Sequence, residues 1–272
     1  MSNPVTKLEM GVVLRGAFGF VSDNVPHMIR AAFVPFLVSM GATLFFLFSF
    51  GPSAGLDPIA AVTDPRFASL GLITNLISAV ASLVFACSWH RATLIGLDSP
   101  RTGIGFHLGT PELTYLIRLV LIFLITIPVV ALVALVAMPL ISSMGMMVAV
   151  LGMMLLLLMV LYVYARLSLS LPAAAIGHTS FGLASSWRAT APVHMDLLWS
   201  HLFFNVIIIV AAFLISFLVS IVTSLLFSSL PFVAAIANLA VQSAVTFVGT
   251  ACAASFLSWV YGQLGEKPEW VQ

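Results

Sequence analysis

The amino-acid sequence predicts an all-α, polytopic membrane protein with six transmembrane helices. Of its 272 residues, 61% are hydrophobic and only 7% are charged, whereas about 25% of the residues of an ordinary soluble domain are charged. Several apolar runs also reach the roughly 20 residues that a helix needs to cross the bilayer core. We expect a single transmembrane domain over 1–272, with spans at about 31–50, 69–89, 119–138, 146–165, 202–227 and 232–259.

The first expected element is a short interfacial helix at about 4–20. Met10, Val13 and Ala17 share one helical face, whereas Arg15 lies on another. This separation of apolar and polar faces is typical of an amphipathic helix that lies in the membrane surface. A break that contains a proline separates this helix from the first span.

The following spans are marked by polar or aromatic residues at their ends. The second span ends in Trp89, His90 and Arg91, a combination that anchors a helix at the water boundary. Arg118 stands at the start of the third span, and an uncharged turn at 139–145 leads into the fourth.

A polar island at 166–190 separates the fourth span from the fifth. We interpret it as the end of a span, a proline stop and a second interfacial helix at about 180–190. Arg166 should anchor the span end, with Trp187 and Arg188 at the level of the lipid head groups. The candidate structural residues of the island are Arg166, Ser168, Pro172, Ser186, Trp187, Arg188 and Thr190.

The basic residues predict the orientation in the membrane. With the amino terminus in the cytoplasm, nine of the ten Lys and Arg residues fall on the cytoplasmic side and only Arg66 falls outside. Cytoplasmic loops carry this excess of positive charge. We therefore expect a protein of the bacterial inner membrane with both termini in the cytoplasm.

The order of the elements contains a weak internal repeat. Pro26, Pro111 and Pro192 each follow a polar or amphipathic lead-in and precede two apolar spans. Two of the three units end in an aromatic residue with an arginine two positions later, Arg91 or Arg166. This pattern predicts a pseudo-threefold bundle of helical hairpins in parallel orientation. The alternative is that any six-span protein with short loops has evenly spaced polar gaps.

Composition and motifs disfavour several classes of function. A net charge of +1 argues against nucleic acid as a partner. Cys87 and Cys252 fall inside spans, as packing residues do. His194 and His201 share a helical face, but no pattern of carboxylates or cysteines accompanies them. Since no catalytic motif is present and no acidic residue lies within a span, we expect a protein that is not an enzyme, with no catalytic, cofactor or metal site.

Polar residues recur at helical spacing within two of the spans. The stripes are Asn75, Ser78 and Ser82 in the second span and Asn238, Gln242 and Thr246 in the sixth. We favour interhelical hydrogen bonding for these residues, at about 0.6–2 kcal/mol per bond. The alternative is a polar groove for a lipid head group or a small solute.

Three arginines stand where spans meet the expected cytoplasmic interface. Arg30, Arg91 and Arg118 are candidates for contacts with lipid head groups, and plain topological anchoring is the alternative.

The island resembles part of a broad bacterial group of six-span proteins that includes the membrane domain attached to some glycerophosphodiester phosphodiesterases. The likeness rests on Arg166, Ser168, Pro172 and the alanines after it, and then on 184–190. About 25 residues match in motif, and the remaining chain is similar in span layout. The resemblance implies a membrane-embedded, non-catalytic protein of the inner membrane.

One departure from that group concerns the residues after the proline segment. An acidic residue often stands there, whereas this chain has Gly177 and His178. We also expect no soluble phosphodiesterase domain, so hydrolytic activity is not carried over.

These observations favour a non-enzymatic, multi-pass membrane protein. We expect it to associate with lipids or to serve as an accessory or scaffold subunit of a membrane complex. The alternative is a carrier or channel for lipids or small apolar solutes that uses the polar stripes. The expected partners are membrane lipids and other integral membrane proteins, and no cofactor is expected.

Overall fold

Helices, joined by short turns, are the regular secondary structure in the part of the chain that the structure describes. The computed structural model describes residues 7–50, 65–98, 108–144 and 146–264. Six helices within these ranges are long and apolar enough to cross a membrane, which confirms the all-α, polytopic fold. They are α2 (Val25–Phe50), α4 (Pro65–Ile95), α5 (Thr110–Met144), α6 (Met146–Leu167), α9 (His194–Leu226) and α10 (Pro231–Leu264).

The short helices lie together at one end of the molecule. They are α1 (Met10–Asp23), α7 (Ser170–Ala175), α8 (Leu183–Ala189) and a 3-10 turn, η1 (Ala191–Val193). The described chain also begins and ends here, since Leu8 donates to Asp196 at the start of α9 and Leu264 lies beside α8. We call this end, formed by α1, α7, α8 and the helix ends that contact them, the base. The opposite ends of the long helices are the far ends.

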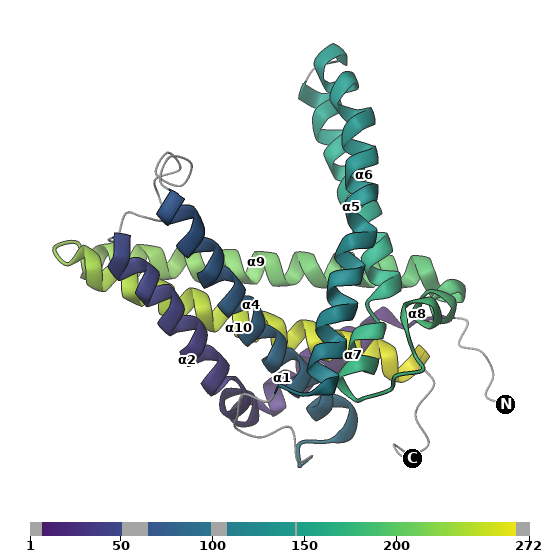
Figure 1. Cartoon of the computed structure of the whole chain (residues 1–272), viewed down its shortest axis with the longest axis horizontal. Helices are drawn as coiled ribbons and strands as arrows, with labels where there is room; N and C mark the ends of the chain where they lie inside the picture. Colours follow the sequence, from purple (N-terminus) through teal and green to yellow (C-terminus); the bar gives the residue numbers. More distant parts are fainter. Residues whose placement is uncertain (1–6, 51–64, 99–107, 145, 265–272) are drawn as a thin grey trace.

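The long helices form three hairpins that meet at the base. The pairs α2/α4, α5/α6 and α9/α10 pack within each hairpin, and α10 also packs on α2 and α4. Away from the base, the α5/α6 hairpin points away from the other two (Figure 1). The first and third hairpins are therefore neighbours along much of their length, whereas the second is separate at its far end.

Several helices are longer than the spans expected from the sequence. The α5 helix has 35 residues, about 50 Å at 1.5 Å per residue, against a hydrocarbon core of about 30 Å. It continues past Pro139 to Met144, so the expected turn at 139–145 is helical over 139–144, and position 145 lies outside the described residues. A continuous helix keeps its backbone hydrogen bonds satisfied where the bilayer supplies no water.

The tightest packing is in the base. Trp89, Phe85, Phe256 and Tyr261 are among the largest fully buried side chains. All six residues of α7 are buried, with Pro172 in the first turn, where a missing N–H costs little. The front part of the polar island, expected as a span end and a proline stop, is thus a core element of the base.

The second helix of each hairpin ends against the segment that leads into another hairpin. The end of α4 pairs with the start of α5 through Arg91 and Glu112. The end of α6 contacts α8 through Arg166 and Trp187. The end of α10 packs along α1. This cyclic order of contacts is the arrangement that a threefold repeat of hairpins would produce.

Candidate functional site

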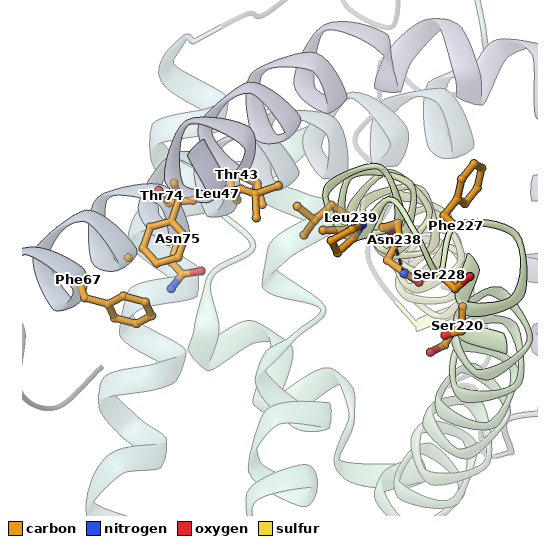
Figure 2. Close-up of a pocket in the computed structure, with 17 residues that line it drawn as sticks. Thr43, Leu47, Phe67, Thr74, Asn75, Ser220, Phe227, Ser228, Asn238 and Leu239 are labelled. Carbon is orange, nitrogen blue, oxygen red and sulfur yellow. Dashed lines mark hydrogen bonds between the residues drawn. The ribbon is translucent and has the colours of Figure 1, made fainter. Parts of the chain in front are cut away.

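A cavity of about 1060 Å³ lies between the far halves of the first and third hairpins. Its walls come from α2 and α4 on one side and from α9 and α10 on the other (Figure 2). The lining residues are Thr43, Phe46, Leu47, Phe67, Gly71, Thr74, Asn75, Ser78, Ser220, Ser224, Phe227, Ser228, Pro231, Ala234, Ala235, Asn238 and Leu239. Binding pockets for small molecules have volumes of about 300–1,000 Å³, so the cavity is large enough for a ligand of that size.

Helical periodicity explains why these residues share one cavity. On α4, Gly71, Asn75 and Ser78 recur at spacings of four and three residues, so they lie on one face. On α9, Ser220 and Ser224 are four residues apart. Gly71 adds space, because an added Cβ there would stand 3.6 Å from the Phe46 ring, an ordinary contact distance.

The lining is polar but uncharged. Hydroxyl and amide groups occur together with aromatic rings, and no Lys, Arg, Asp, Glu or His is among the lining residues that the structure describes. Such a surface can hydrogen-bond hydroxyl, ester or amide groups, while its rings contact apolar chains. It offers no charge to attract an ion.

Two asparagines on opposite walls of the cavity differ in their hydrogen bonding. The Asn238 side chain donates to Thr223 Oγ1 at 2.9 Å and to the Ala234 carbonyl at 2.9 Å, which ties α10 to α9. Asn75 stands on the opposite wall (Figure 2), and its side-chain amide bonds no other residue in the described ranges. Asn75 is therefore free to bond a ligand.

A smaller cavity of about 280 Å³ continues from the first toward the base. Ser78 and Leu239 line both cavities, and the smaller one adds residues from the same helices. Those from the predicted stripes are Ser82, Gln242 and Thr246. The structure thus brings all six stripe residues to two connected cavities between α4 and α10.

The stripes also contribute to helix packing. Ser39 on α2 donates to the Ser78 hydroxyl of α4 at 3.0 Å, and Asn238 bonds Thr223 across α9 and α10. Some stripe residues therefore join helices, as the packing interpretation requires, while Asn75 faces open space.

At the base, two of the three arginines expected at lipid head groups lie inside the protein. Arg91 is 3% exposed and pairs with Glu112, and its Nε donates to the Ala175 carbonyl at 2.7 Å. Arg118 is 7% exposed and donates to the carbonyls of Ser170 and Phe181 at 2.6 and 2.8 Å. This burial corrects the expectation for Arg91 and Arg118, because their guanidinium groups bond the protein.

The third of these arginines, Arg30, is exposed. Contact of Arg30 with lipid head groups stays a prediction.

The residues of the island form one connected cluster. The Arg166 guanidinium lies 3.7 Å from the centroid of the Trp187 ring. It also donates to the Trp187 carbonyl at 2.5 Å and to Thr190 Oγ1 at 3.2 Å. Ser186 in turn donates to the Arg166 carbonyl at 2.6 Å. These bonds fix α8 against the end of α6.

The remaining island residues have separate positions. Ser168 and Pro172 are buried in the base, and the Ser168 hydroxyl donates to the Ala165 carbonyl at 3.0 Å. Arg188 is exposed on the opposite side of α8 from the buried Ser186.

The sequence reasoning missed Glu112 and the polar contacts near it. Glu112 accepts from Arg91 with one oxygen and from the Gly109 backbone N–H at 2.9 Å with the other. Close by, His90 Nδ1 is 2.8 Å from the Ser258 hydroxyl. A Gly-Thr-Pro-Glu sequence before an apolar run was the available signal, since an acidic residue in the first turn marks a helix start.

The two histidines that share a face of α9 have no metal-binding arrangement. His201 is buried between Tyr164 and Phe256, and its Nδ1 lies 3.0 Å from the Leu197 carbonyl. His194 Nδ1 lies 2.8 Å from the Ala191 carbonyl. Among the residues that the structure describes, no group of three His, Cys, Asp or Glu could hold a metal ion.

Comparison of the chain with family models, with curated proteins and with solved structures finds no match. The likeness of the island to the membrane domain of glycerophosphodiester phosphodiesterases therefore stays a prediction.

Proposed function

We propose that this chain is a non-enzymatic, lipid-associated membrane protein that binds an uncharged part of a lipid or a similar amphipathic molecule in the cavity between its first and third hairpins. The observation that carries the proposal is the convergence of Asn75, Ser78 and Asn238 on one cavity of about 1060 Å³. Polar groups within a membrane span are costly unless they are satisfied or functional. Asn75 has no partner in the described chain, so a bound molecule would satisfy it.

The chemistry of the lining supports the ligand class. Since the described lining residues carry no charge, they would not compensate a buried phosphate or carboxylate. Glycerol hydroxyls, ester carbonyls and amides match its hydroxyl and amide groups, and acyl chains match Phe46, Phe67 and Phe227.

Two features of the base support a non-enzymatic role. Both carboxylate oxygens of Glu112 accept hydrogen bonds, so this buried acid serves in an ion pair. The buried Arg91, Arg118 and Arg166 bond carbonyls or side chains of the protein. These charged groups stabilise the junction of the three hairpins.

The proposal is tested by extracting the full chain in mild detergent and measuring bound lipids by native mass spectrometry. Ala235→Leu adds volume inside the cavity, whereas Ala244→Leu makes the same change at an exposed position of α10. We expect a bound amphipathic molecule in the wild type and in A244L, and its loss in A235L. Equal retention by A235L and the wild type, or an empty wild type, would contradict the proposal.

An accessory subunit of a membrane complex is the second candidate. It is favoured by the α5/α6 hairpin, whose far part points away from the other hairpins (Figure 1). Leu151, Met153 and Leu157 on α6 are each about 60% exposed. A second integral membrane protein would pack against this hairpin, and a stoichiometric partner retained in mild detergent would support this role.

A further inference from the structure

A second, chemically different cavity lies at the base. Its volume is about 550 Å³, and it is enclosed by the 176–182 segment, α8 and the end of α10. It shares no lining residue with the cavity between the hairpins. Its polar lining residues are His178, Ser180, Ser185 and Arg188, and Phe181 and Leu264 add apolar surface.

The cation in this cavity differs from the other arginines of the base. Arg91 and Arg118 are buried and bond carbonyl groups, whereas Arg188 is exposed and its guanidinium bonds no other residue in the described ranges. No carboxylate is among the lining residues that the structure describes. Within the described ranges, Arg188 therefore supplies a positive charge that no carboxylate pairs with.

Hydroxyl groups accompany this charge. Ser185 and Arg188 are three residues apart on α8, so they lie on the same face. The side-chain hydroxyls of Ser180 and Ser185 bond no other side chain or backbone group that the structure describes. Both are available as donors to a ligand in the cavity.

The histidine is held in place by the end of α10. Gly177 adopts a left-handed conformation with φ of 80°, which ends α7 and turns the chain. His178 Nδ1 then lies 2.6 Å from the Tyr261 hydroxyl. This bond orients the ring and leaves Nε2 without a described partner, as a further polar atom for the cavity.

We propose that Arg188, Ser185, Ser180 and His178 form a binding site for a phosphate group, supplied by a phospholipid head group. A guanidinium and hydroxyl donors match the oxygens of a phosphate, and arginine binds such oxygens in a bidentate manner. The neighbouring Trp187 is 38% exposed and lies on Arg166, an aromatic position typical of the head-group level. This site does not depend on the proposed function of the other cavity.

A phosphate-binding site and a simple anchoring charge differ in whether the serine hydroxyl is needed. An anchoring arginine would attract any anionic surface and would not need the serine hydroxyl. A phosphate site needs both, so Ser185→Ala should weaken binding although it leaves the net charge unchanged. Arg15→Gln is the matched control, because Arg15 is another exposed arginine of the base and lies on α1.

The experiment uses the purified full chain in uncharged detergent with three probes: phosphatidylglycerol, diacylglycerol and inorganic phosphate. Binding is measured as the rise in unfolding temperature with probe concentration. Phosphatidylglycerol should stabilise the wild type and R15Q. Diacylglycerol lacks the phosphate, so any stabilisation that it gives should be the same in R188Q as in the wild type. R188Q and S185A should bind phosphatidylglycerol at least about tenfold more weakly.

The probes also separate the possible sources of the phosphate. Stabilisation by inorganic phosphate that is lost in R188Q supports a site for the phosphate group alone. The proposal is overturned if R188Q and S185A respond to phosphatidylglycerol and to inorganic phosphate as the wild type does. As a control, both variants should unfold near the wild-type temperature when no probe is present, which would show that they are folded.

Discussion

Arg91 and Glu112 form a buried ion pair that joins the end of α4 to the start of α5. Arg91 Nη2 lies 2.5 Å from Glu112 Oε1, and the two side chains are 4% and 3% exposed. The pair connects the first hairpin to the second across 21 residues of sequence. It places a charged contact at the centre of the base, where the hairpins meet.

Replacement of Glu112 by Gln should lower the free energy of unfolding by about 3–5 kcal/mol, because Arg91 would stay buried without its counter-charge. Thermal or denaturant unfolding in detergent measures the change. Glu9→Gln is the control, since Glu9 is exposed at the start of α1 and its loss should cost less than about 0.5 kcal/mol. Equal stability of E112Q and E9Q would show that the pair is not important for folding.

Replacement of Arg166 by Lys should lower stability by about 2 kcal/mol, because a lysine cannot both cover the Trp187 ring and bond the same carbonyl and hydroxyl. Amide hydrogen exchange of 183–190 should become faster, since these contacts hold α8. Arg15→Lys, at an exposed position, should change neither quantity. Unchanged exchange in R166K would contradict the assigned role of the cluster.

The two asparagines of the cavity should respond differently to replacement by Leu. Asn238→Leu removes the bond to Thr223 and should cost about 0.6–2 kcal/mol. Asn75→Leu removes no bond to a described residue, so it should keep stability and lose the bound molecule. Denaturation curves and lipid analysis of the two variants give the comparison. Loss of stability in N75L and retention of the ligand would reverse this assignment.

Two glycines of α1 provide a test of its contact with α10. An added Cβ at Gly16 would lie 2.7 Å from ring atoms of Trp259, whereas one at Gly19 would meet nothing within 4 Å. Gly16→Ala should therefore destabilise the protein by about 1–3 kcal/mol, and Gly19→Ala should stabilise it by about 0.4–1 kcal/mol. Unfolding temperatures check both, and the opposite order would mean that α1 does not pack on α10 in this way.

The orientation of the molecule can be tested with a reporter enzyme that is active only in the periplasm. Of the basic residues that the structure describes, Arg15, Arg30 and Arg188 are exposed near the base, whereas Arg66 lies at the far end of α4. From the positive-inside rule we therefore expect the base to lie in the cytoplasm. A fusion after Gln272 should be inactive, and one after Phe50, at the far end of α2, should be active. The reverse pattern would invert the topology.

The prediction of six helices succeeded because hydrophobicity over about 20 residues is a local property of the chain. The lengths of the helices were less predictable, since α5 continues past Pro139. In the bilayer core a continuous helix is more stable than an early turn, because the turn would leave backbone groups without hydrogen bonds. The polar stripes were also visible in the sequence. Whether Asn75 and Asn238 would meet at a cavity was not, because this depends on how two hairpins diverge.

The sequence by itself determined that the chain is helical, crosses a membrane and carries polar stripes on α4 and α10. Only the tertiary structure decided that Arg91 and Arg118 are internal while Arg188 faces a cavity. Arg91 and Arg118 stand near span ends and Arg188 stands in the second interfacial helix, so the sequence places all three near the membrane interface. Their roles depend on partners brought close by folding, such as Glu112 for Arg91 and the Ser170 carbonyl for Arg118. Burial makes such pairing necessary, and an exposed guanidinium needs none.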